Sequence, residues 1–414
     1  MEKNTVILRD TDVFMRGELD NVTISDGRIV LDLVQGGYVP YGCYTSAPLP
    51  MPAFDALRVS WNADAPNQTA VEMQARVMVD GNWTTWVTFG KWSRFLHRES
   101  PAPLDRGCLQ QRPDVLQLDS KTGQQVQLRI YLYTKTERAT PAISLLCASV
   151  CTQDGIPAGG RPVNTRLHLL PYAAARRAPA LRPWMDLACS LTSLTNRWGA
   201  DLLPEELAQV LRDWRADSTD AHNLCFAAAA AATWGFPAWV CYGNLALLRE
   251  EARHGFGAVV ALQATAAGSA PQVLLCDPCA AETDFATETA MPLDSFMVAW
   301  DNVALLMRPN GSRFAPRTRI GAWVRPAGAE FPDVYRLFVN GEAHPLPEDF
   351  CTGGGLLAWT EADGTVHAST AHRSFHFTEP VQGGLCIPKQ ETPRKCTVYA
   401  IDPAGQMLVG DVTV

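Results

Sequence analysis

Apolar and polar residues alternate along two segments in the first part of the chain. Between residues 71 and 79 the odd positions are valine, methionine or alanine, and the intervening positions are mostly polar. Residues 126–133 alternate in the same way, with valine, leucine or isoleucine at the even positions. A period of two is typical of a strand with one solvent-facing side. Asp80-Gly81-Asn82 follows the first segment and indicates a hairpin turn. The pattern predicts a β-sandwich over residues 1–160.

The periodicity changes in the middle of the chain, after a segment rich in proline, arginine and alanine. Apolar residues from Leu207 to Trp214 recur at helical spacing, and Pro204 stands where such a helix is expected to begin. A second helix is expected at 223–234. Buried strands are expected at 238–241, 258–262 and 273–276. Mixed helices and strands predict an α+β domain over residues 166–312.

Turn signals return in the last part of the chain, at Asn340-Gly341, Gly353-Gly354-Gly355 and Asp363-Gly364. They predict a small β-domain over residues 313–414. The fold class is therefore α+β multidomain, with an N-terminal β-sandwich, an α+β middle domain and a small C-terminal β-domain.

One uncharged run, Leu224 to Leu248, is long enough to cross a bilayer, which needs about 20 residues. Its alanines are only weakly hydrophobic, and Gly235-Phe236-Pro237 would break a single helix. No cluster of Lys or Arg flanks the run. We therefore expect a buried helix followed by a buried strand, and no membrane span.

Composition narrows the classes of function. The 414 residues correspond to about three domains. With 47% apolar and 19% charged residues the chain can form real cores, and it is not expected to be disordered. A formal net charge of −8 without a basic block argues against nucleic acid as a partner. The 12 cysteines show no fixed spacing, and no apolar segment of signal-peptide length opens the sequence. We expect reduced thiols and a cytoplasmic location.

Cys189 is the sharpest candidate for chemistry. It lies in Cys189-Ser190-Leu191-Thr192-Ser193-Leu194, shortly after Pro183-Trp184, where we expect a helix to begin. A cysteine at a helix N-terminus gains thiolate character, because the unpaired N–H groups favour negative charge. Such a thiolate is a possible nucleophile. The alternative is a small buried thiol with no catalytic role, which is common among cysteines.

This segment resembles the nucleophile helix of the double-glycine-leader (bacteriocin-processing) cysteine peptidase-like domains, which have a papain-like fold. The similarity continues downstream in four segments: 222–240, 245–260, Asp277-Pro278 and 296–300. Around residues 41–46, 60–66 and 80–86 the N-terminal region is similar to the β-sandwich that precedes this domain in some bacterial proteins, which favours a bacterial source.

The resemblance implies a mechanism with four parts. Cys189 matches the nucleophile and Asp277 matches the acid that orients a histidine. The family's histidine is absent from the interval 263–273, where Gln272 is the nearest polar residue to the expected place. The family's oxyanion glutamine is also absent, because residues 170–175 read LPYAAA. Two other histidines, His222 and His254, are possible displaced bases, and Ser190 and Gln272 are possible neighbours of the site.

Three weaker signals concern metals and sugars. Cys276 and Cys279 form a Cys-x-x-Cys pair, but no second pair stands at zinc-site spacing. His372 and His376 would share a face on a strand. We expect neither a metal nor a cofactor. Trp61, Trp83, Trp86 and Trp92 could stack on carbohydrate, although recurring tryptophan in a sandwich is more often core.

Two hypotheses remain open at this point. The first is a binding or scaffold protein, for a peptide or protein ligand, built on a catalytically degenerate papain-like domain. Its basis is the missing histidine and glutamine. The second is an active cysteine peptidase or amidase that uses Cys189 with a displaced histidine. General-base catalysis contributes about 10²–10⁴-fold, so losing the base would leave little activity.

Overall fold

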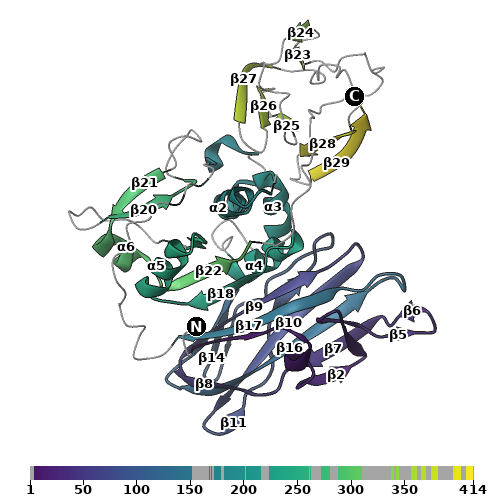
Figure 1. Ribbon diagram of the computed structural model, residues 1–414, viewed down its shortest axis with the longest axis vertical. Helices are drawn as coiled ribbons and strands as arrows, with labels where there is room; N and C mark the ends of the chain where they lie inside the picture. The colour runs from purple at the N-terminus through teal and green to yellow at the C-terminus, as the bar shows by residue number, and fades with distance from the viewer. Residues whose placement is uncertain are drawn as a thin grey trace. The chain divides into compact units, whose positions relative to one another are not determined.

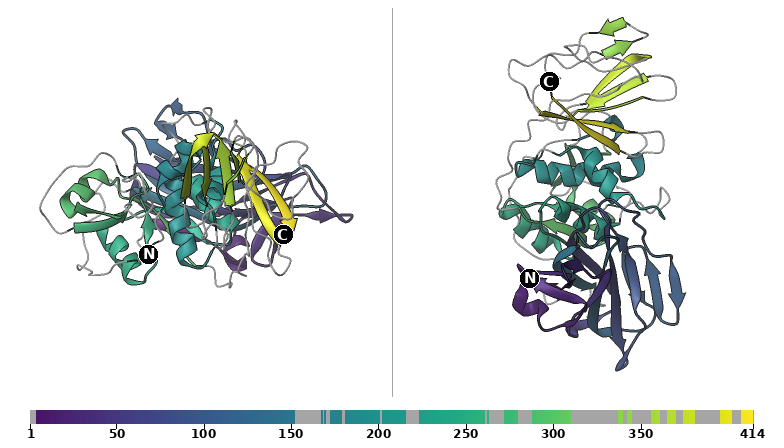
Figure 2. Two further views of the ribbon diagram at one scale, coloured as in Figure 1. Left: turned by 90° about the horizontal axis from the view of Figure 1, so that it is seen from above. Right: turned by 90° about the vertical axis from the view of Figure 1, so that its right-hand side faces the viewer.

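Figures 1 and 2 show the computed structural model of the chain. The chain divides into two compact units. Unit 1 comprises residues 1–167, 210–273 and 291–310, and unit 2 comprises residues 168–209, 274–290 and 311–414. The residues whose structure is described are 4–151, 167, 169, 172–178, 181–200, 202–215, 223–260, 262, 272–279, 288–309, 337–339, 342–344, 356–360, 365–369, 374–380, 395–401 and 407–413.

The N-terminal part of unit 1 is a β-sandwich, as the alternation predicted. Its first sheet has eight strands, and α1 (Thr11–Phe14) follows the first of them along the chain. In order across the sheet these strands are β13 (Leu104–Arg106), β14 (Leu109–Arg112), β15 (Val115–Leu118), β9 (Ala56–Asp64), β17 (Ala142–Cys151), β4 (Arg28–Leu31) and β3 (Val22–Ser25), with β1 (Thr5–Leu8) also paired to β17.

The second sheet has seven strands. They are β11 (Asn82–Trp83), β10 (Thr69–Val79), β16 (Gly123–Thr134), β7 (Tyr41–Thr45) and β2 (Glu18–Asp20), with β12 (Val87–Trp92) paired to β10 and β8 (Leu49–Phe54) paired to β16. A separate hairpin joins β5 (Leu33–Val34) and β6 (Gly37–Tyr38).

The predicted alternation gives the two long strands of this second sheet, β10 and β16, one buried side each. The apolar side chains of β10 and β16 point into the core; Val71, Met73, Ala75, Val77, Val126, Leu128, Ile130 and Leu132 are each 0% exposed. The polar residues between them are mostly half-buried and form the outer face of the sheet. Asp80 and Gly81 both have positive φ, at 50° and 77°, as a two-residue hairpin turn requires.

Unit 1 also contains a small three-stranded sheet and three helices. The sheet has the order β18 (Ala238–Tyr242), β22 (Val303–Met307), β19 (Ala258–Val259). The helices are α4 (Leu224–Thr233), α5 (Leu245–Arg253) and α6 (Leu293–Ala299). The uncharged run 224–248 is thus divided among α4, β18 and the start of α5, as expected from its Gly-Phe-Pro break. In the described part of the chain no helix is long and apolar enough to cross a membrane.

Helix α4 packs directly against the sandwich (Figure 1). Its Phe226 ring meets the buried Trp61 ring edge to face, with centroids 6.1 Å apart. Phe226 also lies close to Gly90 of β12, where an added Cβ would be 3.2 Å from the phenyl ring and 2.8 Å from the Glu99 carbonyl oxygen. Gly90 has φ 109°, so both its backbone conformation and the close approach of Phe226 favour glycine there.

Strand β18 has one free edge, and side chains of the sandwich satisfy every backbone group along it. Asn62 accepts from the Ala238 N–H at 3.0 Å and donates to the Ala238 carbonyl at 2.6 Å. Ser60 Oγ accepts from Val240 N–H at 3.0 Å, and Ser149 Oγ accepts from Tyr242 N–H at 2.9 Å. The remaining carbonyls accept from Cys147 Sγ at 3.7 Å and Asn4 Nδ2 at 3.3 Å. An open strand edge is thereby closed without another strand.

Unit 2 contains the 3₁₀ helix η1 (Ala174–Arg176), the helix α2 (Arg182–Arg197) and most of α3 (Pro204–Leu211). Strands β20 (Gln272–Cys276) and β21 (Glu288–Pro292) pair with each other. The C-terminal part is all strand where it is described. β23 (Leu337–Val339) pairs with β24 (Glu342–His344), and a five-stranded sheet has the order β27 (Ser374–Pro380), β26 (Thr365–Ser369), β25 (Leu356–Thr360), β28 (Lys395–Ile401), β29 (Met407–Thr413).

Two predicted elements are shorter in the structure: the strand expected at 258–262 is β19, which ends at Val259, and one helix ends early. The helix expected from Leu207 to Trp214 ends at Leu211, so Trp214 is not part of it. The Trp214 N–H instead donates to the Arg98 carbonyl at 3.0 Å, and its ring stacks on His97 with centroids 5.1 Å apart. These contacts with the loop after β12 override the helical spacing of the sequence.

Candidate functional site

Cys189 lies inside α2 rather than at its start. The helix begins at Arg182, so Cys189 is about two turns from its N-terminus. The expectation that the helix terminus acts directly on this thiol is therefore wrong, because that effect falls off within the first turn. Cys189 is 0% exposed, and Ala188 and Thr192 beside it are also buried. Ser190, the predicted neighbour, is half-buried.

The surroundings of α2 are held by buried polar contacts. Asn196 donates to the Tyr172 hydroxyl at 2.8 Å and to the Leu202 carbonyl at 2.9 Å. The Arg177 guanidinium lies over the Tyr172 ring at 5.2 Å and is 3.7 Å from a carboxylate oxygen of Glu205. Both members of this ion pair are 0% exposed. The segment just before α2, in which the family's glutamine is missing, is thus fixed against α2 and α3.

Asp277 occupies the turn that follows β20, in the same unit as Cys189. Its Oδ1 accepts from the Cys279 N–H at 2.9 Å, so one carboxylate oxygen is used in closing the turn. The next residue, Pro278, accepts from the Ala174 N–H at 2.9 Å through its carbonyl. Asp277 therefore serves a local structural purpose here, whatever its further role.

Cys279 is the thiol on which Asp277 acts electrostatically. Partial burial, followed by the negative charges of Asp186 and Asp277, raises the pKa of Cys279 to about 11, while Arg182 opposes the shift. A thiol with so high a pKa is a poor nucleophile at neutral pH. Asp186 lies one turn before Cys189 on α2, and the sequence analysis did not identify it. Its position between Pro183 and Cys189, in the segment expected to begin a helix, could have drawn attention to it.

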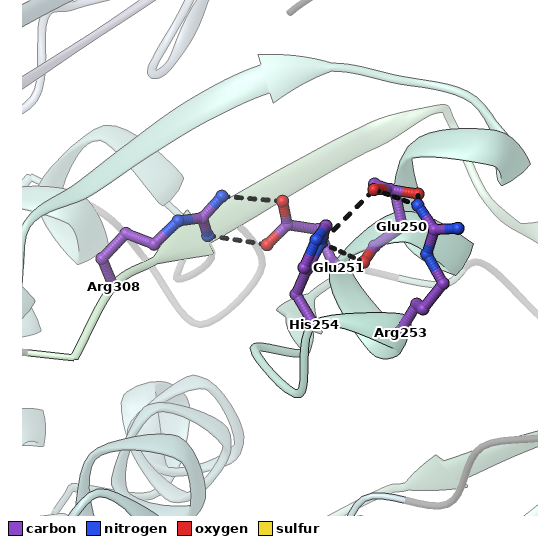
Figure 3. Close-up of polar contacts among 5 residues, drawn as sticks. All are labelled: Glu250, Glu251, Arg253, His254 and Arg308. Carbon is purple, nitrogen blue, oxygen red and sulfur yellow. Dashed lines mark hydrogen bonds and ion pairs between the residues drawn. The ribbon is translucent and has the colours of Figure 1, made fainter.

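His254 caps the C-terminus of α5 (Figure 3). Its Nδ1 lies 3.0 Å from the Glu250 carbonyl oxygen and 3.4 Å from a Glu250 carboxylate oxygen, and its ring is stacked on Phe256. The contacts that the structure gives this imidazole are therefore those of a helix cap at the surface. His222, the other proposed base, lies outside the described residues.

An ion pair with a buried carboxylate lies beside this cap. Glu251 accepts two hydrogen bonds from Arg308, at 2.6 and 2.7 Å, and its side chain is 6% exposed (Figure 3). The guanidinium also lies over the Trp239 ring at 4.8 Å and over the Phe256 ring at 4.4 Å. This arrangement fixes α5 against the end of β22 and the start of β18.

The remaining candidates are only partly within the described structure. Gln272 is the first residue of β20. His367 and His376 are register partners on β26 and β27, whereas His372 lies outside the described residues. Among the residues that are described, no group of three or more His, Cys, Asp or Glu side chains is placed to hold a metal ion.

The four tryptophans of the sandwich separate into two kinds. Trp61 and Trp92 are 0% exposed core residues, so they cannot stack on a sugar. Trp83 and Trp86 are half-buried and contact Arg76, a residue of the outer face of β10. Sequence reasoning missed that arginine, although its polar position between apolar neighbours on β10 was visible.

Comparison with known proteins supports a peptidase-like relationship at a coarse level. Residues 9–151 match the family model described as the Peptidase C39 N-terminal domain. The matched range covers most of the β-sandwich and ends where β17 ends. None of the curated proteins matches the chain.

Two solved structures show weak similarity. One is a Podospora anserina GH26-CBM35 β-(1,4)-mannanase, 10% identical over 46% of this chain and 35% of that chain, with a TM-score of 0.19. The other is a family two carbohydrate esterase from Cellvibrio japonicus, 14% identical over 45% of this chain and 50% of that chain, with a TM-score of 0.18. The chain thus spans half or less of each, and similarity at these TM-scores carries no argument about fold or function.

Proposed function

We propose that this chain is a catalytically degenerate relative of C39-type cysteine peptidases, with a papain-like middle domain, and that it binds a peptide or protein ligand instead of cleaving it. The observation that carries the proposal is the position of Cys189. Its side chain is fully buried in the body of α2. A nucleophile must reach a substrate carbonyl carbon, and a thiol without exposed surface does not present itself to one.

The other parts of the expected mechanism support the same reading. One carboxylate oxygen of Asp277, the matched acid, accepts a hydrogen bond from the Cys279 N–H. His254 makes its contacts with Glu250 and Phe256 at the end of α5. Residues 170–175, where an oxyanion donor is expected, offer no glutamine. Without a base and an oxyanion donor, such a domain lacks the groups that lower the barrier to cleavage, while binding of a ligand does not require them.

The test is the pH dependence of cysteine alkylation in the folded full-length chain. Iodoacetamide is added at pH 6 to 9, and modified cysteines are identified by peptide mapping. We expect Cys189 to stay unmodified until the protein is denatured, because the reagent cannot reach it. Cys189→Ala is the control that assigns the signal, and Cys279→Ala is the matched control for a thiol at the surface of the same unit.

Rapid modification of Cys189 near pH 6, with an apparent pKa well below about 8.5, would overturn the proposal. Peptide or amide hydrolysis that disappears in Cys189→Ala would do the same. Either result would favour the alternative, an active cysteine peptidase or amidase. The variants His222→Ala and His254→Ala would then identify the displaced base.

A further inference from the structure

The outer face of the second sandwich sheet carries an alternating row of rings and guanidinium groups. Arg76 lies 4.8 Å from the centroid of Trp83 and 4.6 Å from that of Trp86. Arg129 lies 4.1 Å from the centroid of Trp86 and 5.1 Å from that of Tyr131. We call Trp83, Arg76, Trp86, Arg129 and Tyr131 the Arg–Trp ladder. It crosses from β11 over β10 to β16, strands that are neighbours in the sheet.

Both guanidinium groups are held in place by neutral partners. Arg76 donates through Nε to the Gln127 side-chain oxygen at 2.8 Å. Arg129 donates through Nε and Nη2 to the Gln74 side-chain oxygen, at 3.2 and 2.6 Å. A guanidinium has five N–H donors, so each arginine keeps donors in its plane that these contacts do not use. The aromatic rings cover the faces of the guanidinium groups and leave their edges for a ligand.

The positive charge of the ladder is not neutralised within the described residues. No carboxylate there lies within 4.0 Å of Arg76 or Arg129, although ion pairs occur elsewhere in the sandwich, as between Lys121 and Asp80 at 2.7 Å. The nearby Glu72 accepts from Gln74 at 2.9 Å and from the Tyr133 hydroxyl at 3.4 Å. Two rigid cations lie side by side here, and among the described residues neither is in an ion pair; on a chain with a net charge of −8 they offer a local site for an oxyanion.

The position of the ladder argues against an extended peptide as its ligand. β10 pairs with β16 on one side and with β11 and β12 on the other, while β16 pairs with β10, β7 and β8. The backbone groups of these interior strands are used within the sheet, so a peptide cannot add to them as a further strand. A ligand on this face is recognised by rings and side-chain hydrogen bonds alone.

Beyond the ladder the same face continues with more rings and one more cation. Tyr131 and Tyr133 are stacked with centroids 6.1 Å apart and an interplanar angle of 17°. Lys91 Nζ lies 5.0 Å from the centroid of Tyr133. Aromatic faces suit the C–H faces of sugar rings, and arginine edges suit carboxylates in a bidentate way.

We propose that the Arg–Trp ladder and the neighbouring Tyr133 and Lys91 bind an anionic oligosaccharide whose rings carry carboxylates, of the uronic acid type. The carboxylate accepts hydrogen bonds from the free edges of Arg76 and Arg129. Adjacent sugar rings lie along the tyrosines toward Lys91. This site is on the sandwich and is independent of the fate of Cys189.

The test uses the full-length chain and isothermal titration calorimetry with trigalacturonate. The methyl ester of the same trisaccharide is the matched ligand without charge. We expect binding of the acid, no measurable binding of the ester, and weaker binding as NaCl is raised from 50 to 500 mM. Arg129→Gln should weaken binding about tenfold or more, since it removes charged hydrogen bonds.

Other variants test the same site if Arg129→Gln folds poorly. Arg129→Lys preserves the charge but removes the planar fork, and it should also weaken binding. Lys91→Gln changes an exposed residue and should weaken binding by a smaller factor. Arg28→Gln removes one exposed positive charge from the first sheet and should leave binding unchanged.

Three results would overturn the proposal. The first is absence of binding by the acid. The second is equal binding of the ester, which would remove the role of the two arginines. The third is binding of a polyglutamate peptide in preference to trigalacturonate, which would assign the face to an acidic peptide.

Discussion

Asn62 offers the sharpest test of how the sandwich and the small sheet of unit 1 depend on each other. Its side chain lies on β9 and is 1% exposed. Both of its bonds go to Ala238, the first residue of β18, which is 176 positions later in the chain. Asn62→Ala removes the donor and the acceptor together and leaves the two backbone groups of Ala238 without partners.

The magnitude follows from these contacts. A typical intramolecular hydrogen bond contributes about 0.5–1.5 kcal/mol net, but a buried group left unsatisfied costs about 1–3 kcal/mol. With two backbone groups orphaned, we expect Asn62→Ala to lower the free energy of unfolding by about 2–5 kcal/mol. Ser60→Ala orphans only the Val240 N–H and should cost about 1–3 kcal/mol. The ratio of the two losses in unfolding free energy tests whether Asn62 satisfies two backbone groups of β18 and Ser60 satisfies one.

The assay is thermal unfolding of the full-length variants, measured by differential scanning calorimetry. A loss of about 3 kcal/mol should lower Tm by roughly 6–12 °C for a unit of this size. Asn82→Ala is the matched control, because Asn82 is exposed and makes one local bond to the Asp80 carbonyl. That variant should stay within about 0.5 kcal/mol of the parent chain.

Two results would refute the reasoning. One is a Tm for Asn62→Ala within about 1 °C of that of Asn82→Ala, a smaller gap than the orphaned Ala238 groups allow. The other is a pair of separate transitions in which only the sandwich is affected. If Asn62 joins the two parts, β9 and β18 must unfold in the same transition.

Four further predictions concern a buried charge, a glycine and, in two cases, a thiol. Glu251→Gln should cost about 1–3 kcal/mol in urea unfolding, because it leaves the Arg308 guanidinium without its carboxylate; Arg308 is 29% exposed, which limits the loss. Gly90→Ala should lower Tm by several degrees, since its Cβ would lie 2.8 Å from a backbone carbonyl oxygen at a φ of 109°; a Tm equal to the parent value would contradict this. The Cys279 thiol is protonated below its raised pKa of about 11, so its alkylation rate should rise about tenfold per pH unit from pH 8 to 10. Asp186→Asn should speed this alkylation at pH 9, because removing a negative charge favours the thiolate; an unchanged rate would contradict the assigned cause.

Local patterns predicted the elements of the sandwich well, because each is decided by near neighbours in sequence. The alternation in β10 and β16 and the Asp80-Gly81 turn are of this kind. The first residue of α2 could also have been predicted from a local pattern. Pro183 stands in the first turn of the helix, just as Pro204 does in α3, and the rule that placed one helix start would have placed the other.

Contacts between distant segments were not available from such patterns. Ser60 and Asn62 alternate with Val59, Trp61 and Ala63, so on sequence alone they are expected to face solvent. They are buried because β18 covers them. No local pattern near residue 60 indicates that a strand beginning at residue 238 packs there. The Arg–Trp ladder is similar, since its members come from three strands and the turn between β11 and β12.

The closed edge of β18 also bears on how the sandwich relates to the segment after it. An edge strand with open N–H and C=O groups pairs readily with other chains, so it must be covered or closed. Here the closing groups are Asn4, Ser60, Asn62, Cys147 and Ser149, all from the sandwich. Residues 1–160 and 166–312 differ in sequence pattern, yet the first segment completes the hydrogen bonding of the second. The sandwich therefore acts within unit 1 as part of the framework that holds β18, while its opposite sheet keeps the Arg–Trp ladder available on its outer face.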